Sequence, residues 1–173
     1  IMADPHWNQG DYYAGQVPTE GVIQVLMSIT LQAQHPIIFN QLHAASSATE
    51  KKPLEDIQAN FIAVEQLRAM AAARAHYADA NHILYLVRAN QLFIAGHGDS
   101  LEEGLANIQA KTLLLPAAND LLLQPYLAKR VSSILQEQGK PVSYEEIMGP
   151  WGHLDGVLSI SSKEDLLRDF LTK

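Results

Sequence analysis

Two predicted strands, each followed within a few residues by a polar side chain, constrain the fold of this chain more than any other feature. Residues 112–116 form a short continuous apolar run, as expected for a parallel strand buried on both faces, and Asp120 follows it. Residues 142–147 form the second strand, and His153 follows in a glycine-flanked loop that can bend tightly. An amphipathic helix at 125–138 separates the strands. This order predicts parallel strands joined by a helical crossover, with both polar side chains beyond the carboxyl ends of the strands.

Two strands cannot form a stable sheet by themselves, so the segment after residue 96 predicts only part of a domain. A terminal amphipathic helix at 163–171 adds a second helix to this part. The predicted fold class is α/β, a parallel sheet flanked by helices. We expect the remaining strands of the sheet to come from chain that precedes this segment.

Asp120 and His153 together predict the acid and base of an acyl-transfer site. A carboxylate hydrogen-bonded to one imidazole nitrogen fixes the tautomer and supports the imidazolium that forms when the other nitrogen takes a proton. Each residue alone would more often be structural, Asp120 as a helix cap and His153 as a packed loop residue. Their order, each just after its own strand, favours the second and third members of a Ser–Asp–His triad. No Gly-x-Ser-x-Gly sequence occurs in the 173 residues, so we expect the nucleophilic serine outside this chain.

Two neighbours of His153 are weaker candidates for contacts with a substrate. Trp151 is more often a packing residue than a substrate platform, and its position leaves both interpretations open. Asp155 lies two residues after His153, which places it poorly for the acid role, so we interpret it as a turn residue or a substrate contact. The other histidines show no metal-ligand spacing, and no His-Glu-x-x-His sequence occurs. We expect no bound metal and no bound cofactor.

Composition argues against several other classes of function. The chain carries 19 acidic and 12 basic residues and no basic stripe, which disfavours a nucleic-acid or anionic-membrane partner. It contains no cysteine, so it has no disulfide, no thiolate metal ligand and no cysteine nucleophile of its own. Its apolar runs are too short to span a bilayer. The lack of cysteine does not fix the compartment, and we expect a cytoplasmic protein.

The first 95 residues predict helices. Residues 21–33 place apolar side chains on one helix face, and Pro36 is expected to end that helix. A second helix is expected to begin at Pro53, because apolar residues recur at helical spacing after it. This stripe consists of Ile57, Phe61, Val64 and Leu67. Asp79 is expected to cap a third helix, and the turn-rich residues 1–19 are expected to form an ordered loop.

Four segments of the chain carry a resemblance to a known family. They are Asp-Pro-His-Trp-Asn-Gln-Gly-Asp-Tyr-Tyr at 4–13, Ala-Asp-Ala-Asn-His-Ile-Leu-Tyr-Leu-Val-Arg-Ala-Asn at 78–90, the Asp120 segment, and Gly-His at 152–153. In these segments the chain resembles the second half of homoserine O-acetyltransferases and their MetX-like relatives, within the α/β-hydrolase superfamily. The resemblance implies that residues 1–19 lead from the core sheet, 20–95 form an inserted helical lid, and 96–173 form the C-terminal part of the core.

The resemblance also implies an activity. The family transfers an acyl group through an acyl-serine in a ping-pong reaction, so Asp120 would be the triad acid and His153 the triad base. A small-molecule acyl donor such as acetyl-CoA is then compatible as a substrate. An N-terminal segment or chain would supply the serine, and a homodimer is compatible with the sequence. The resemblance implies neither a nucleic-acid nor a membrane partner.

The resemblance is weaker at the positions that would bind homoserine. Family members carry an Arg and a Tyr on the first lid helix, at places that fall at about Leu26 and Ala33 here. They also carry an Asp directly after the catalytic His, to hold the substrate amine, where this chain has Leu154 and an Asp one residue later. A zwitterionic acceptor would therefore lack charged partners.

These departures favour an esterase that uses water, or a transferase with a less polar acceptor, acting on an acyl ester or thioester. Two alternatives stay open. One is a homoserine O-acetyltransferase proper, and the other is a non-catalytic α/β-hydrolase-like binding module. An upstream serine in a sharp strand–turn–helix elbow would decide for an enzyme.

Overall fold

The structure, a computed structural model, describes residues 1–42 and 52–172 of the 173-residue chain. It divides the chain into two compact units, one comprising Ile1–Leu31 and Phe39–Leu92 and the other comprising Gln32–Ile38 and Phe93–Lys173. The expected division at residue 95 lies three residues after the observed one at residue 92. Residues 1–19, expected as a loop from the core sheet, belong to the first unit. Residues 43–51 of the expected lid lie outside the described residues, and a lid role for the first unit stays a prediction.

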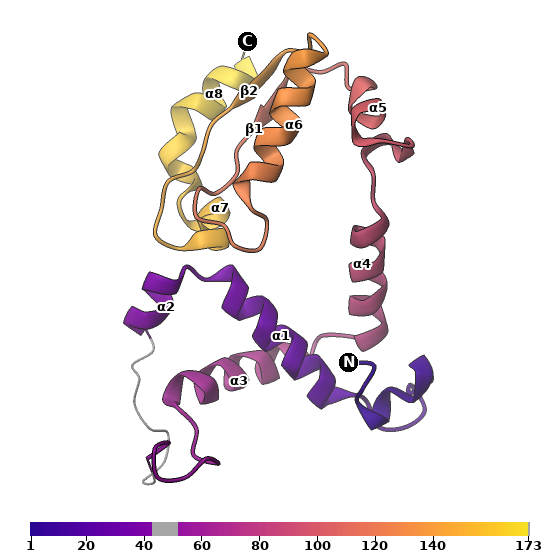
Figure 1. Ribbon diagram of the computed structural model, residues 1–173, viewed down its shortest axis with the longest axis vertical. Helices are drawn as coiled ribbons and strands as arrows, with labels where there is room; N and C mark the ends of the chain where they lie inside the picture. The colour runs from indigo at the N-terminus through magenta and orange to yellow at the C-terminus, as the bar shows by residue number, and fades with distance from the viewer. Residues whose placement is uncertain (43–51, 173) are drawn as a thin grey trace. The chain divides into compact units, whose positions relative to one another are not determined.

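The part of the chain before residue 93 is helical in the described residues (Figure 1). Its elements are η1 (Pro5–Gly10), α1 (Thr19–Ala33), α2 (Pro36–Leu42), α3 (Ile62–Ala75) and α4 (Ala80–Leu92). The core of the first unit lies between α1, α3 and the start of α4, and Tyr12 packs into it. Its buried members are Tyr12, Val22, Ile23, Leu26, Ala71, Ala75 and Ala80. The predicted apolar face of the first helix is confirmed at Val22 and Leu26.

The start of α3 differs from the prediction. The helix begins at Ile62 and not at Pro53, because the residues between them form turns. In one of these turns Asp56 Oδ1 accepts a hydrogen bond from the Gln58 N–H at 2.9 Å, and such local bonds compete with a helix. Ile57 is therefore 99% exposed and lies outside the apolar face that the spacing predicts.

Pro36 lies between two helices, after the end of α1 and at the first position of α2. Helix α1 ends at Ala33 before the proline, as predicted, and α2 begins at Pro36 itself, where the missing N–H costs no helical hydrogen bond. Among the helices of the described residues, none alone is long and apolar enough to cross a membrane. By length and composition α1 and α2 meet that test only together, as a pair bent by 111°.

Asp79 caps α4, as the sequence predicts. Its Oδ1 accepts a hydrogen bond from the His82 N–H at 2.7 Å, and its Oδ2 accepts one from the Tyr12 hydroxyl at 2.6 Å. The neighbouring Asn81 accepts a hydrogen bond from the indole N–H of Trp7 at 3.0 Å. These contacts attach the aromatic N-terminal segment to the beginning of α4, so the segment is ordered and lies against a core.

The second unit contains the two predicted strands. Strands β1 (Thr112–Leu114) and β2 (Val142–Tyr144) are parallel, with Leu113 opposite Ser143. Helix α6 (Pro125–Glu137) connects them, and Figure 1 shows the strands between α6 and α8 (Glu164–Thr172). This arrangement confirms the predicted crossover. The remaining short elements of this unit are η2 (Ala95–His97), α5 (Leu101–Ala106), η3 (Gly152–Leu154), α7 (Asp155–Leu158) and η4 (Ile160–Lys163).

Helix α5 was not predicted, although the sequence carries its N-terminal signal. Ser100 Oγ accepts a hydrogen bond from the Glu103 N–H at 3.1 Å, and the Glu103 carboxylate accepts one from the Asp99 N–H at 3.0 Å. This is a close variant of the Ser-x-x-Glu capping box. Leu105 of this helix joins α6 in the core of the second unit, where Ile134 and Leu135 are buried.

We expect Gly104→Ala to destabilise the protein, although alanine is the better helix former. A Cβ atom at residue 104 would lie 1.5 Å from the carbonyl oxygen of Ala95, and neither backbone can move without disturbing the packing of α5. The free energy of unfolding should fall by roughly 2 kcal/mol or more, measured by thermal or denaturant unfolding. Gly156→Ala, whose Cβ meets nothing within 4 Å, should be neutral or stabilising by up to about 1 kcal/mol. Equal effects of the two substitutions would contradict this packing.

Candidate functional site

The pairing of the strands continues beyond β1 and β2 and brings two loops together. Ala117 forms a further parallel bridge with Ile147, and both residues are buried. The Ile147 N–H donates to the carbonyl of Pro116 at 2.9 Å, and the Ala118 N–H donates to the carbonyl of Ile147 at 3.0 Å. The loop that carries Asp120 and the loop that carries His153 therefore leave the sheet side by side.

Asp120 lies at the beginning of its loop with its side chain only 6% exposed. Its Oδ1 accepts hydrogen bonds from the N–H groups of Leu122 and Leu123, both at 2.8 Å. Its Oδ2 is 2.8 Å from Nδ1 of His153. Two backbone donors thus fix the orientation of the carboxylate and direct its second oxygen to the imidazole.

The contact with Asp120 assigns the tautomer of His153. A carboxylate accepts hydrogen bonds, so the 2.8 Å contact places a proton on Nδ1, and in the neutral imidazole the lone pair is then on Nε2. The His153 side chain is 35% exposed, in contrast to the buried carboxylate behind it. The ring is therefore held on one side and can accept a proton on the other.

Gly152 allows the His153 loop to approach another part of the second unit. Its φ angle is +67°, a conformation that L side chains rarely adopt. A Cβ atom there would lie 2.9 Å from the backbone nitrogen of His35 and 3.2 Å from the carbonyl oxygen of Ala33. The segment between α1 and α2 thus lies against the loop that carries the imidazole.

A cavity of about 450 Å³ lies beside the Asp120–His153 pair. Most of its walls are apolar and come from the end of β1 and the start of α6. The lining residues are Leu114, Leu115, Pro116, Ala117, Asp120, Leu123, Gln124, Leu127, Ala128, His153 and Gly156. A small, largely apolar group could occupy this space next to the imidazole.

Trp151 and Asp155, the weaker candidates, lie in the loop that carries His153. Trp151 is half-buried and is absent from the described residues that line this cavity. Asp155 is 0% exposed, and its Oδ2 and Oδ1 accept hydrogen bonds from the Trp151 N–H and the Ser159 hydroxyl. The Asp155 carboxylate therefore points into its own loop, and a substrate contact for Asp155 stays a prediction.

The structure also adds a residue that sequence reasoning missed. The side-chain amide of Asn119 donates to the carbonyl of Gly149 at 3.1 Å and links the Asp120 loop to the His153 loop. No spacing signal marks this contact, because it depends on how the two loops fold after the strands end.

Leu26 falls at one of the two places where the family carries an Arg or a Tyr on the first lid helix. In this structure Leu26 is 6% exposed and is therefore a core residue of the first unit. Leu154 is half-buried and follows His153 directly. Leu154 places no charge directly after His153.

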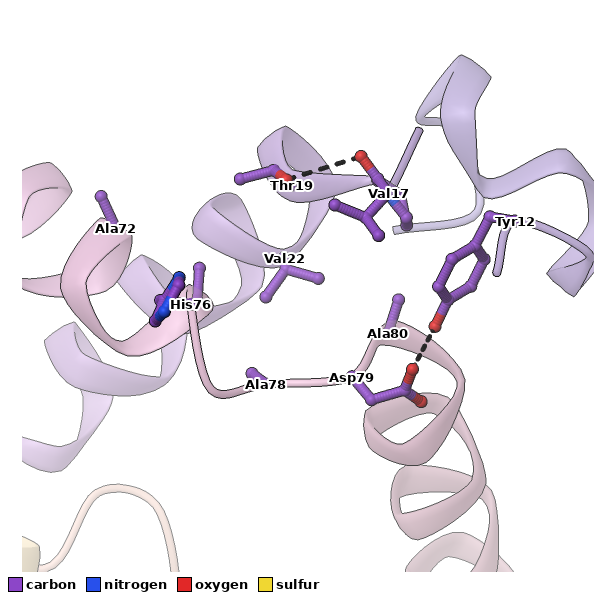
Figure 2. A pocket seen from close by; sticks show the side chains of 11 residues that line it. Tyr12, Val17, Thr19, Val22, Ala72, His76, Ala78, Asp79 and Ala80 are labelled. Atoms are coloured by element: carbon purple, nitrogen blue, oxygen red, sulfur yellow. Dashed lines mark hydrogen bonds between the residues drawn. The ribbon is translucent and has the colours of Figure 1, made fainter. Parts of the chain in front are cut away.

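A second cavity, of about 290 Å³, lies within the first unit (Figure 2). Burial and the adjacent Asp79 carboxylate raise the pKa of Tyr12, one of its lining residues, to about 12. Figure 2 shows the Tyr12 hydroxyl donating to Asp79, a contact that already serves the cap of α4. Across residues 1–42 and 52–172, no group of three or more His, Asp or Glu side chains is arranged to hold a metal ion.

Comparisons with known proteins give two kinds of relative. No protein-family model matches the chain. In sequence it is similar to a homoserine O-acetyltransferase of Methanohalobium evestigatum, with 28% identity over 172 residues. That similarity covers 99% of this chain but 35% of the relative.

In structure the chain is similar to esterase E22, with a TM-score of 0.92 and 43% sequence identity, covering 99% of this chain and 47% of that one. It is also similar to homoserine O-acetyltransferase from Bacillus anthracis, with a TM-score of 0.91 and 27% identity, covering 100% and 46%. The chain spans less than half the length of each of these three proteins.

Proposed function

We propose, on the premise that this chain has the fold of the C-terminal part of an α/β-hydrolase related to homoserine O-acetyltransferases, that it supplies the acid and base of a serine-dependent acyl-ester hydrolase or acyltransferase. The observation that carries the proposal is the 2.8 Å contact between Asp120 Oδ2 and His153 Nδ1. It lies beyond the carboxyl ends of two parallel strands, where α/β proteins place their ligand sites.

Each residue has one role in this proposal. Nε2 of His153 takes the proton of a serine hydroxyl as the serine oxygen attacks the carbonyl carbon of the acyl donor. Asp120 holds the ring and stabilises the imidazolium, which then gives its proton to the departing alcohol or thiol. An acyl-serine remains. Water or an acceptor alcohol, deprotonated by the same Nε2, attacks the acyl-serine and releases the free acid or a new ester, while the imidazolium returns its proton to the departing serine oxygen.

The serine is supplied by an N-terminal segment or chain, because this sequence contains no nucleophile elbow. The test uses the complete protein with a chromogenic acetyl ester and follows its intact mass during turnover. We expect one added acetyl group, located by peptide mapping on a serine in a strand–turn–helix elbow. Absence of both the adduct and turnover would instead favour a non-catalytic binding module.

The charge pattern next to His153 supports a neutral acceptor or water over homoserine. Leu154 carries no charge, and the buried Asp155 has both carboxylate oxygens occupied. The described residues 152–156 therefore present no free carboxylate to a substrate ammonium. The 43% identity to a protein named as an esterase supports the same choice, while the 27–28% relatives named homoserine O-acetyltransferase support the rival.

We expect neutral aryl or alkyl acetates to outcompete homoserine. An ammonium group without a partner loses a charge-assisted hydrogen bond and keeps its desolvation cost, on the order of 3 kcal/mol or about a hundredfold in specificity. The measurement compares hydrolysis of a neutral acetate with acetylation of homoserine by acetyl-CoA, both as kcat/KM.

A substitution sharpens this comparison. Leu154→Asp should raise homoserine acetylation relative to ester hydrolysis, whereas the isosteric Leu154→Asn, which carries no charge, should not. Efficient acetylation of homoserine by the unsubstituted protein, with weak ester hydrolysis, would show that another residue supplies the charge and that the substrate argument is wrong.

A further inference from the structure

Asp155 is a buried carboxylate that the proposed reaction does not use. It is 0% exposed, and its position two residues after His153 places it in the same loop. Its Oδ2 accepts a hydrogen bond from the Trp151 N–H at 3.0 Å, on the N-terminal side of His153. Its Oδ1 accepts one from the Ser159 hydroxyl at 2.6 Å, on the C-terminal side. One side chain thus ties both flanks of the loop together.

Gly149 extends this connection to the Asp120 loop. A Cβ atom at residue 149 would lie 1.8 Å from Asp155 Oδ1, so only glycine lets the carboxylate approach the backbone there. The carbonyl of Gly149 accepts the hydrogen bond from the Asn119 side chain, and Asn119 directly precedes Asp120. A continuous series of contacts therefore runs from Asp155 through Gly149 and Asn119 to the partner of His153.

Burying a charged group is costly unless its hydrogen bonds are made. An apolar side chain would fill the same space at lower cost if filling space were the only requirement. Asp155 instead makes polar contacts on both sides of His153, at the place where the imidazole must stay in line with Asp120.

We infer that Asp155 is a positioning residue, which holds the His153 loop so that Nδ1 stays bonded to Asp120. The inference rests on the proposed function, because it gives Asp155 a role only if His153 is the base. Without the carboxylate, the Trp151 and Ser159 ends of the loop separate and the ring leaves its 2.8 Å contact. A displacement of about 1 Å in a catalytic group can lower a rate by roughly a hundredfold.

The test uses the complete protein, a neutral acetyl ester and four variants. Asp155→Ala should lower kcat by about 10- to 100-fold and leave KM within about threefold, since the substrate does not touch Asp155. Asp155→Asn should recover part of the loss, because its amide oxygen can still accept from the Trp151 N–H. Ser159→Ala, which removes one of the two contacts, should give a smaller loss of kcat. Asp165→Ala, an exposed carboxylate on α8, is the matched control and should change nothing.

A second readout reports the position of the ring directly. With ¹⁵N-labelled histidine, the proton on Nδ1 of His153 should give a low-field resonance that is lost in His153→Ala and in Asp120→Ala. Asp155→Ala should weaken or remove this resonance in a protein that keeps its native circular dichroism, and Asp165→Ala should leave it intact. A merely structural role for Asp155 would lower the melting temperature without moving this signal.

A folded Asp155→Ala protein with unchanged kcat, or with the low-field resonance unchanged, would overturn the inference. If Asp155→Ala does not fold, Ser159→Ala decides by the same two measurements. Retained activity in His153→Ala, or no low-field resonance in the unsubstituted protein, would count against the proposed base and hence against the positioning role that depends on it. Loss of activity in His153→Ala together with an indifferent Asp155→Ala would overturn the positioning role alone.

Discussion

Replacing His153 with alanine in the complete protein should lower kcat for an acyl ester by about 10³-fold or more, as losses of a triad base do. Among the described residues, the imidazole is the only group hydrogen-bonded to Asp120 Oδ2, so the substitution leaves this carboxylate without the base that it orients. The melting temperature should change little, because the side chain is 35% exposed and lies at the edge of a cavity. Steady-state kinetics and a thermal melt check both parts.

The control for this substitution is His97→Asn. His97 is exposed in the same unit and has a φ of +52°, which asparagine tolerates, so this variant should keep full activity. A His153→Ala protein with more than about a tenth of the original kcat would remove the general base from the proposal.

Asp120→Asn should also lower kcat strongly, and for a geometric reason. The amide oxygen of asparagine must take the place of Oδ1, because two backbone N–H groups point at that position. The amide nitrogen then faces Nδ1 of His153 and donates to it, which forces the ring proton onto Nε2. That tautomer cannot accept the proton of a serine, so kcat should fall by about 10⁴-fold, the size of the loss for this change in a known triad.

The folded state should survive Asp120→Asn, since the two backbone donors keep their acceptor. A thermal melt should place the variant within a few degrees of the unsubstituted protein, and Asp165→Asn provides the matched surface change. Near-normal turnover in a folded Asp120→Asn protein would mean that the contact with His153 is structural.

The parts of the fold that could be predicted are those with an unambiguous local signal. The strand at 112–116 could be predicted from its short continuous apolar run. The helix from Pro125 to Gly139 could be predicted because its apolar spacing, its initial proline and its terminal glycine agree. The start of α3 could not be predicted, because Asp56 forms a turn where the apolar spacing alone favours a helix. Local side-chain bonds decided that case against periodicity.

The candidate site divides in the same way. Asp120 and His153 could be paired because each follows its own strand, and parallel strands end at one edge. The contacts of Asn119 and Asp155 could not be predicted, because they depend on the conformation of loop backbone that has no repeating sequence pattern. The burial of Leu26 could be predicted, because apolar residues recur at helical spacing along residues 21–33.

The close approach of Gly152 to residues 33–35 has a consequence for the design of truncated variants of this protein. The boundaries suggested by sequence would treat 20–95 as one removable insert. That excision would take away the backbone of Ala33 and His35, which lies within 3.2 Å of where a Cβ on Gly152 would be. The loop that carries the imidazole would then lose its contact with backbone that lies more than a hundred positions earlier in the chain. A truncated form that keeps the second unit therefore has to include Gln32–Ile38.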